Sequence, residues 1–174
     1  MPTTKRPSDK RNILITGTPG TGKTLLSAKL EKELGLRHIN LSKSVKEHAL
    51  HDGHDSEFDT LLLNEDKVID WLEPQIGDGL IVEAHSTEYF PLRYFDLVVC
   101  LTSSKIYERL AAREYSALKI TENIECEIFG ICQEQAREFP NCLVLSSDNV
   151  DELAHNIKVI KARYLENAIS SRII

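Results

Sequence analysis

Residues 17–24 are the part of the chain whose types and spacing most clearly indicate chemistry. They read Gly-Thr-Pro-Gly-Thr-Gly-Lys-Thr and match the pattern G-x-x-x-x-G-K-[ST] in full. Glycines let such a loop curl so that successive N–H groups point at phosphate oxygens, and the helix that follows adds its positive N-terminal end. We expect Lys23 to reach the β- and γ-phosphates, as a catalytic group, and Thr24 to place a hydroxyl beside Mg²⁺. The pattern predicts an ATP site formed by Gly20, Thr21, Gly22, Lys23, Thr24 and Leu25.

Apolar, β-branched runs alternate with helical patterns along the chain, and the phosphate loop lies between the first run and the first helix. The expected strands are about 11–16, 37–41, 80–84, 95–101 and 142–146. The expected helices are about 25–34, 42–50, 64–75, 103–113, 121–139 and 150–168. This alternation predicts one α/β domain over residues 11–170: a P-loop NTPase with a doubly wound, parallel, five-stranded sheet flanked by helices.

The composition limits the classes of partner. The chain has 21 basic and 27 acidic side chains and a formal charge of -6, which argues against direct, sequence-specific binding of nucleic acid. It lacks both the run of roughly 18 to 20 apolar residues that a membrane span needs and the apolar run of a signal peptide. We therefore expect a soluble, intracellular protein with no membrane partner, and we interpret residues 1–10 as a flexible basic tail.

The four cysteines are few for the length of 174 residues and include no Cys-x-x-Cys. Cys100, Cys126, Cys132 and Cys142 fall in segments with strand or helix patterns, and we interpret them as reduced core thiols. A metal site made by Cys126 and Cys132 with a nearby histidine is the alternative, although structural zinc prefers tighter ligand spacing.

Several sequence blocks beyond the phosphate loop resemble the adenylate kinase isoenzyme 6 family over nearly the whole chain. They are HDGHDSEFD at 51–59, IVEAH at 81–85, FP at 90–91, YERL at 107–110 and TENIECEIF at 121–129. The resemblance implies a nucleoside monophosphate kinase that uses ATP and Mg²⁺, phosphorylates AMP and also hydrolyses ATP. It further implies a role in maturation of the small ribosomal subunit, a ribosomal protein of that subunit as partner, and location in nucleus and cytoplasm.

The resemblance also implies a lid at about 112–122 and a monophosphate-binding region at about 40–63. Arg109 and Arg113 lie one helical turn apart, immediately before an expected polar connection at 114–120. We expect Arg113 to contact ATP as a catalytic group and Arg109 to bind ATP; the alternative is that both are solvated helix charges. The family usually has arginine where this chain has Lys46, our candidate for the monophosphate, and an ammonium cannot grip phosphate as a guanidinium fork does. We interpret residues 51–59 as a solvated acidic loop, with a metal site as the alternative.

At the end of the third expected strand, the family that this chain resembles usually has Asp-x-His. This chain has Glu83-Ala84-His85 there. We expect Glu83 to hold Mg²⁺, mainly through water, and His85 to act as a catalytic group that orients an attacking water or senses the γ-phosphate. From chemistry alone, a structural, hydrogen-bonded histidine is the alternative.

Two other functions stay open. The first is a ribosome-assembly ATPase with little kinase activity that binds and releases a ribosomal protein, because Lys46 and Glu83 both depart from the family pattern. The second is a kinase of another small metabolite, because many P-loop kinases share this layout.

Overall fold

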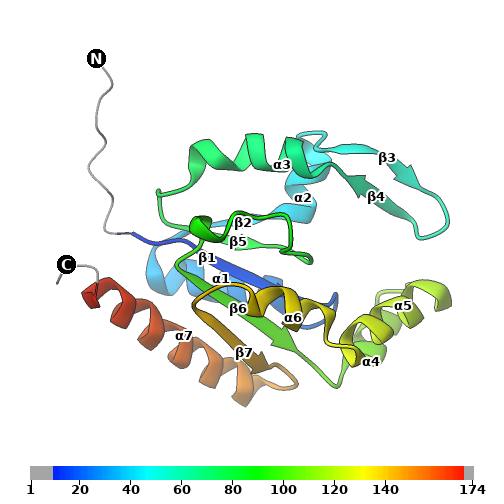
Figure 1. Cartoon of the computed structure of the whole chain (residues 1–174). Helices are drawn as coiled ribbons and strands as arrows, with labels where there is room; N and C mark the ends of the chain where they lie inside the picture. The colour runs from blue at the N-terminus through cyan, green and yellow to red at the C-terminus, as the bar shows by residue number, and fades with distance from the viewer. Residues whose placement is uncertain (1–9, 171–174) are drawn as a thin grey trace.

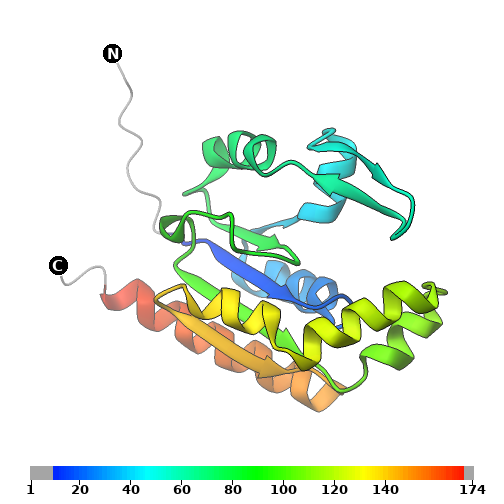
Figure 2. The ribbon, with the colours of Figure 1, turned by 45° about the vertical axis from the view of Figure 1, so that its right-hand side comes forward.

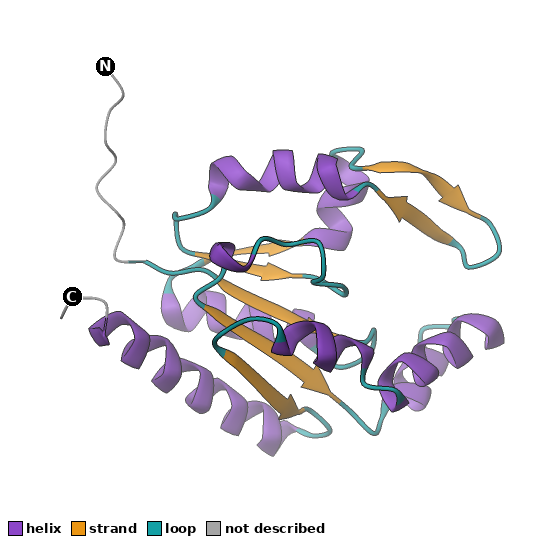
Figure 3. Cartoon of the chain, in the orientation of Figure 1, coloured by secondary structure: helices purple, strands orange, loops and turns teal. Residues whose placement is uncertain are grey.

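The computed structural model describes residues 10–170, which form a parallel sheet with helices on both faces (Figures 1 and 3). The strands are β1 (Ile13–Gly17), β2 (Arg37–Asn40), β3 (His51–Asp55), β4 (Thr60–Leu63), β5 (Leu80–Glu83), β6 (Leu97–Thr102) and β7 (Cys142–Ser146). The helices are α1 (Lys23–Leu34), α2 (Leu41–Glu47), α3 (Glu65–Leu72), α4 (Ile106–Ala112), α5 (Ala117–Ile128), α6 (Ile131–Arg137) and α7 (Val150–Ser170), with 3₁₀ turns η1 (Glu73–Gln75) and η2 (Leu92–Tyr94).

Within the described residues the main sheet has five parallel strands in the order β2-β5-β1-β6-β7. This confirms the predicted doubly wound α/β fold. The predicted basic tail lies outside the described residues except for Lys10, whose Nζ donates to Gly35 O at 3.1 Å. No helix of residues 10–170 is both long and apolar enough to cross a bilayer.

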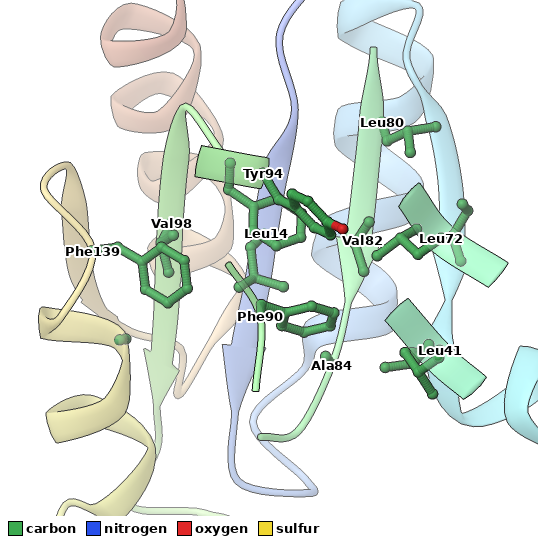
Figure 4. Packing of buried hydrophobic residues seen from close by; sticks show 14 of the residues in the cluster. Leu14, Leu41, Leu72, Leu80, Val82, Ala84, Phe90, Tyr94, Val98 and Phe139 are labelled. Carbon is green, nitrogen blue, oxygen red and sulfur yellow. The ribbon is translucent and has the colours of Figure 1, made fainter. Parts of the chain in front are cut away.

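The central strands are continuous apolar runs because helices cover both of their faces. Leu14 of β1 pairs with Val82 of β5 and Val98 of β6, and these side chains face α2, α3 and α6 (Figure 4). Ile13 and Ile15 alternate to the other face, where they join a second buried cluster with residues of α1 and α7. Burying each such side chain contributes about 1.5–3 kcal/mol, so the strands that carry the site have a rigid base.

Asparagine side chains cap the starts of α2 and α3. Asn64 accepts a hydrogen bond from Lys67 N at 2.9 Å, which confirms the predicted start of α3. The cap of α2 is Asn40 rather than the predicted Ser42, and it accepts from Lys43 N at 3.1 Å. The cap of α4 is Lys105, and the predicted cap Ser103 instead accepts from Lys105 N at 3.0 Å.

The prediction of one helix over 121–139 is wrong. Gly130 has φ 67°, in the left-handed region, and it separates α5 from α6. The helix also starts earlier than expected, because Ser116 caps α5 by accepting from Lys119 N at 3.2 Å. Most of the predicted lid is therefore helical rather than a polar connection.

Residues 51–63 form an antiparallel hairpin, β3–β4, where a loop was expected. Two of its acids have basic partners: His54 lies 3.0 Å from Asp59, and Lys67 lies 3.1 Å from Asp52. Lys119 of α5 donates to Asp59 O at 3.2 Å, and Figure 2 shows that α5 and the hairpin project on the same side of the sheet. Among the described residues the hairpin holds no cluster of three possible metal ligands, which disfavours the metal alternative there.

Candidate active site

The phosphate loop joins the carboxyl end of β1 to α1. Gly17 has φ +142°, and a Cβ there would lie 2.5 Å from Leu101 O, so only glycine fits between β1 and β6. Gly22 precedes α1 with φ 88° and no side-chain cap, which leaves the first N–H groups of the helix available to an anion.

Lys23 folds back over this loop. Its Nζ donates to Gly17 O at 2.7 Å and to Thr18 O at 3.1 Å. Desolvation lowers the pKa of Lys23, while the nearby carboxylate of Glu83 opposes that shift. The ammonium is thus held over the phosphate loop, near the carboxylate of Glu83.

A polar group lies beside the phosphate loop. It consists of Glu83 at the end of β5, Thr24 at the start of α1 and His38 in β2. Thr24 Oγ1 donates to Glu83 Oε1 at 2.6 Å, and His38 Nε2 lies 2.9 Å from Glu83 Oε2. Burial raises the pKa of Glu83, but its hydrogen bonds with His38 and Thr24 and the charges of His38 and Lys23 outweigh this, so its pKa is lowered overall. The result is an ionised carboxylate next to a hydroxyl, which is the hard oxygen donor set that suits Mg²⁺.

His38 is a residue that the sequence reasoning missed. It reaches Glu83 because β2 pairs directly with β5, with Asn40 opposite Glu83. The sequence signal for this contact was a histidine in the second strand. Its contact with Glu83 could be inferred only with knowledge of the order of strands in the sheet.

His85 follows β5 and lies beside the phosphate loop. Its Nδ1 lies 3.3 Å from Gly17 O and 3.8 Å from Cys132 Sγ. Desolvation and then the charge of Lys23 lower the pKa of His85, against a raising effect of the Gly17 hydrogen bond. A neutral ring that donates from Nδ1 to Gly17 O leaves Nε2 as a hydrogen-bond acceptor.

Arg109 lies in α4 and Arg113 caps its C-terminal end, and the two side chains have different surroundings. Arg109 donates to Gly20 O at 2.9 Å, to Ser147 O at 2.9 Å and to Asp148 O at 3.2 Å, so it fastens the phosphate loop to the segment after β7. The exposed Arg113 lines the same cleft, and its guanidinium has no hydrogen bond or ion pair with another residue in the described part of the chain.

Two clefts meet at the phosphate loop. The first, of about 1100 Å³, is lined by Gly20, Gly22, Lys23, Thr24, Leu25, Glu83, His85, Arg109 and Arg113, and thus gathers most of the predicted site. Thr21 is fully buried instead, and its Oγ1 donates to Thr18 O at 2.8 Å within the loop. The second cleft, of about 690 Å³, lies between α2, the hairpin and α5. Both clefts share Pro19, Ser42, His85 and Tyr115.

The second cleft is acidic. The described residues that line it include the four acids Asp59, Glu65, Glu88 and Glu122, with Lys119 as its lysine. Lys46, the residue expected at the monophosphate, is exposed on α2 and lines neither cleft. Sequence reasoning missed Lys119 because its position depends on α5 beginning at Ala117.

The cysteines agree with the interpretation as reduced thiols, since none of the four forms a disulfide. Burial, and then the neighbouring Cys126, raise the pKa of Cys132 to about 12. Cys126 and Cys132 nevertheless lie beside His85, close to the phosphate loop.

Fold and site together define a P-loop protein of the small-kinase type. A solved shikimate kinase from Bacteroides thetaiotaomicron has the same fold, with a TM-score of 0.62 and 12% identity over 87% of this chain and 96% of that one. A family model described as an AAA domain matches residues 13–130.

Relatives in other organisms give the family. The adenylate kinase isoenzyme 6 homolog of Dictyostelium discoideum is 48% identical over 74% of this chain and 75% of its own length. The homolog of Caenorhabditis elegans is 39% identical over 91% of this chain and 90% of its own length. The chain belongs to the adenylate kinase isoenzyme 6 family and is a nucleotide kinase.

Proposed function

We propose that this protein transfers the γ-phosphoryl group of ATP to AMP, with Mg²⁺, and hydrolyses ATP as a second activity. One observation carries the proposal: a cleft at the phosphate loop opens into a second cleft, with Pro19 and His85 at their junction. Each cleft is of the size that small-molecule ligands occupy. ATP in the first would present its γ-phosphate to an acceptor in the second.

The transfer itself asks little covalent chemistry of the protein. An oxygen of the AMP phosphate attacks the γ-phosphorus, the bond to the β–γ bridging oxygen breaks, and two ADP result. The acceptor oxygen is already anionic, so positioning and neutralisation of charge dominate. We assign these tasks to Lys23, fixed in the loop at 2.7 Å from Gly17 O, and to Arg113, whose guanidinium is free of protein partners among the described residues.

Thr24 and Glu83 are the residues that would hold Mg²⁺, the latter through water. The bound ion would neutralise charge on the phosphates. His38 keeps Glu83 ionised and oriented from the opposite side, with its Nε2 2.9 Å from Oε2.

Hydrolysis needs a residue that orients water, and His85 suits this task. With Nδ1 donating to Gly17 O, its Nε2 accepts a hydrogen bond from a water beside the γ-phosphate. Closure of the segment 112–122 would carry Arg113 toward ATP and reduce the access of bulk water.

A second candidate is an assembly ATPase with little kinase activity, and the acidic second cleft favours it. Four carboxylates against Lys119 disfavour a phosphate, whereas they suit a basic protein segment. We propose a ribosomal protein of the small subunit as that partner and a role in small-subunit maturation, in nucleus and cytoplasm.

The test is a product balance. Purified protein is incubated with Mg·ATP, with and without AMP, and ADP and inorganic phosphate are measured in the same tube. ADP that exceeds free phosphate only when AMP is present, by two per AMP consumed, supports the kinase, with hydrolysis seen as slower formation of equal ADP and phosphate. Equal ADP and phosphate, unaffected by AMP, would reject the kinase in favour of the ATPase.

A further inference from the structure

Three possible metal ligands converge behind the phosphate loop. His85 follows β5, Cys126 lies in the last turns of α5, and Cys132 lies in the first turn of α6. Their ligand atoms all lie within 4.8 Å of one another. Among the described residues, this is the group of three or more His, Cys, Asp or Glu side chains that could hold a metal ion. The left-handed Gly130 between α5 and α6 brings the two cysteines together although they are six residues apart.

The distances match the edges of a tetrahedral site. Zinc binds sulfur at about 2.3 Å and histidine nitrogen at about 2.0–2.1 Å, so a tetrahedral ion needs about 3.8 Å between two sulfurs and about 3.6 Å between sulfur and nitrogen. The two Sγ atoms lie 3.9 Å apart, and Cys132 Sγ lies 3.8 Å from His85 Nδ1. Thr18 Oγ1 is 3.9 Å from each sulfur and donates to Glu127 Oε2 at 2.6 Å.

The surroundings suit a divalent cation of borderline softness. Cys132 is 4% exposed, and the half-buried Cys126 and the ring of His85 leave a path to solvent. Two thiolates and a neutral imidazole carry a total charge of -2, which balances the +2 charge of the ion. Binding would therefore add no net charge near Lys23. Binding releases two thiol protons, and the ring proton of His85 moves from Nδ1 to Nε2.

We propose that His85, Cys126 and Cys132 form a binding site for Zn²⁺ beside the phosphate loop. The fourth position is open to water or to the hydroxyl of Thr18. The site is separate from the Mg²⁺ donors, which are oxygen atoms of Thr24 and Glu83.

Occupancy has a consequence for turnover that rests on the proposed function. With the ion on Nδ1, His85 Nε2 carries the ring proton and no longer accepts from a water. Zn²⁺ should therefore suppress ATP hydrolysis, and removal of either cysteine should lift that suppression. The binding itself does not depend on this role, so the two parts are tested separately.

Binding is measured with Co²⁺ on the full-length, reduced protein without nucleotide. A 1:1 titration should give an intense tetrahedral visible spectrum and a thiolate charge-transfer band, and one equivalent of Zn²⁺ should remove both. Cys126→Ser and Cys132→Ser should each weaken Co²⁺ binding by about 100-fold or more, beyond the 10- to 100-fold typical of residues that merely support a ligand. Cys142→Ser, which changes a half-buried thiol outside the cluster, is the matched control and should bind like the wild type.

Three results would overturn the proposal. The first is the absence of the thiolate band, and the second is a band that survives Cys132→Ser. The third is loss of both thiols in air with a mass decrease of about two daltons, which would identify a disulfide pair instead. Circular dichroism on each variant separates lost binding from lost folding. If Zn²⁺ binds as described but ATP hydrolysis is unaffected, the site stands and the role of His85 in hydrolysis fails.

Discussion

Replacing Arg109 by alanine should loosen the phosphate loop. The guanidinium donates to three backbone carbonyls, on Gly20, Ser147 and Asp148, at 2.9, 2.9 and 3.2 Å. A hydrogen bond from a charged group contributes about 1.5–3 kcal/mol when it is protected from water. Arg109 is half-buried, and one side chain makes all three bonds, so we expect a loss of about 2–3 kcal/mol in the free energy of unfolding. For a domain of this size that corresponds to a Tm lower by about 4–12 °C.

The measurement is thermal unfolding followed by circular dichroism, together with the Kd for ATP. Arg113→Ala is the matched control, because this exposed arginine has no such bonds and its loss should change stability by less than about 0.5 kcal/mol. Arg109→Lys should recover only part of the stability, since a single ammonium cannot reach all three carbonyls. The interpretation of Arg109 as a clamp is refuted if Arg109→Ala unfolds within about 1 °C of the wild type.

Three further predictions concern catalysis and binding. Lys23→Ala should lower turnover at least ~100-fold without unfolding the protein, because it removes the charge that meets the transferred phosphoryl group; unchanged ATP affinity and rate would contradict the phosphate-loop assignment. The pKa of His85 is lowered, so the neutral ring persists as pH falls through about 6.5, and the rate of phosphate release should decline only at lower pH; a decline centred at or above about 6.5 would contradict this. Lys119→Ala should raise the KM for AMP, and Lys46→Ala should leave it within about twofold, since Lys119 lines the second cleft and Lys46 does not; the reverse order would restore Lys46 as the monophosphate ligand.

The strands of the sheet could be predicted from the sequence because the features that indicate them are local. The buried strands β1, β5 and β6 are continuous apolar runs, and the phosphate-loop pattern fixes a strand before it and a helix after it. The cap at Asn64 could likewise be read from the chain. These features need no knowledge of which elements lie side by side.

The misses share a dependence on backbone turns and on neighbours distant in sequence. Gly130 divides one amphipathic pattern into α5 and α6, although the pattern continues through it. In the hairpin at 51–63, β3 reads HDGHD and β4 reads TLLL, so neither strand alternates apolar with polar residues and the pattern gave no strand signal.

The same dependence explains the missed site residues. His38 reaches Glu83 only through the pairing of β2 with β5, and Lys119 reaches the second cleft only through the placement of α5. The sequence offered Cys126 and Cys132 with a nearby histidine as an alternative, but which histidine lies there, His85, 47 residues from Cys132, depends on the fold.

The most direct test of the central claim follows the phosphoryl group itself. The protein is incubated with Mg²⁺, ATP labelled at the γ-phosphate, and excess AMP, and the labelled products are separated after a single turnover, with Lys23→Ala as the inactive control. The label should appear at the β-position of the ADP made from AMP. Label found only in inorganic phosphate, at the same rate with and without AMP, would contradict it.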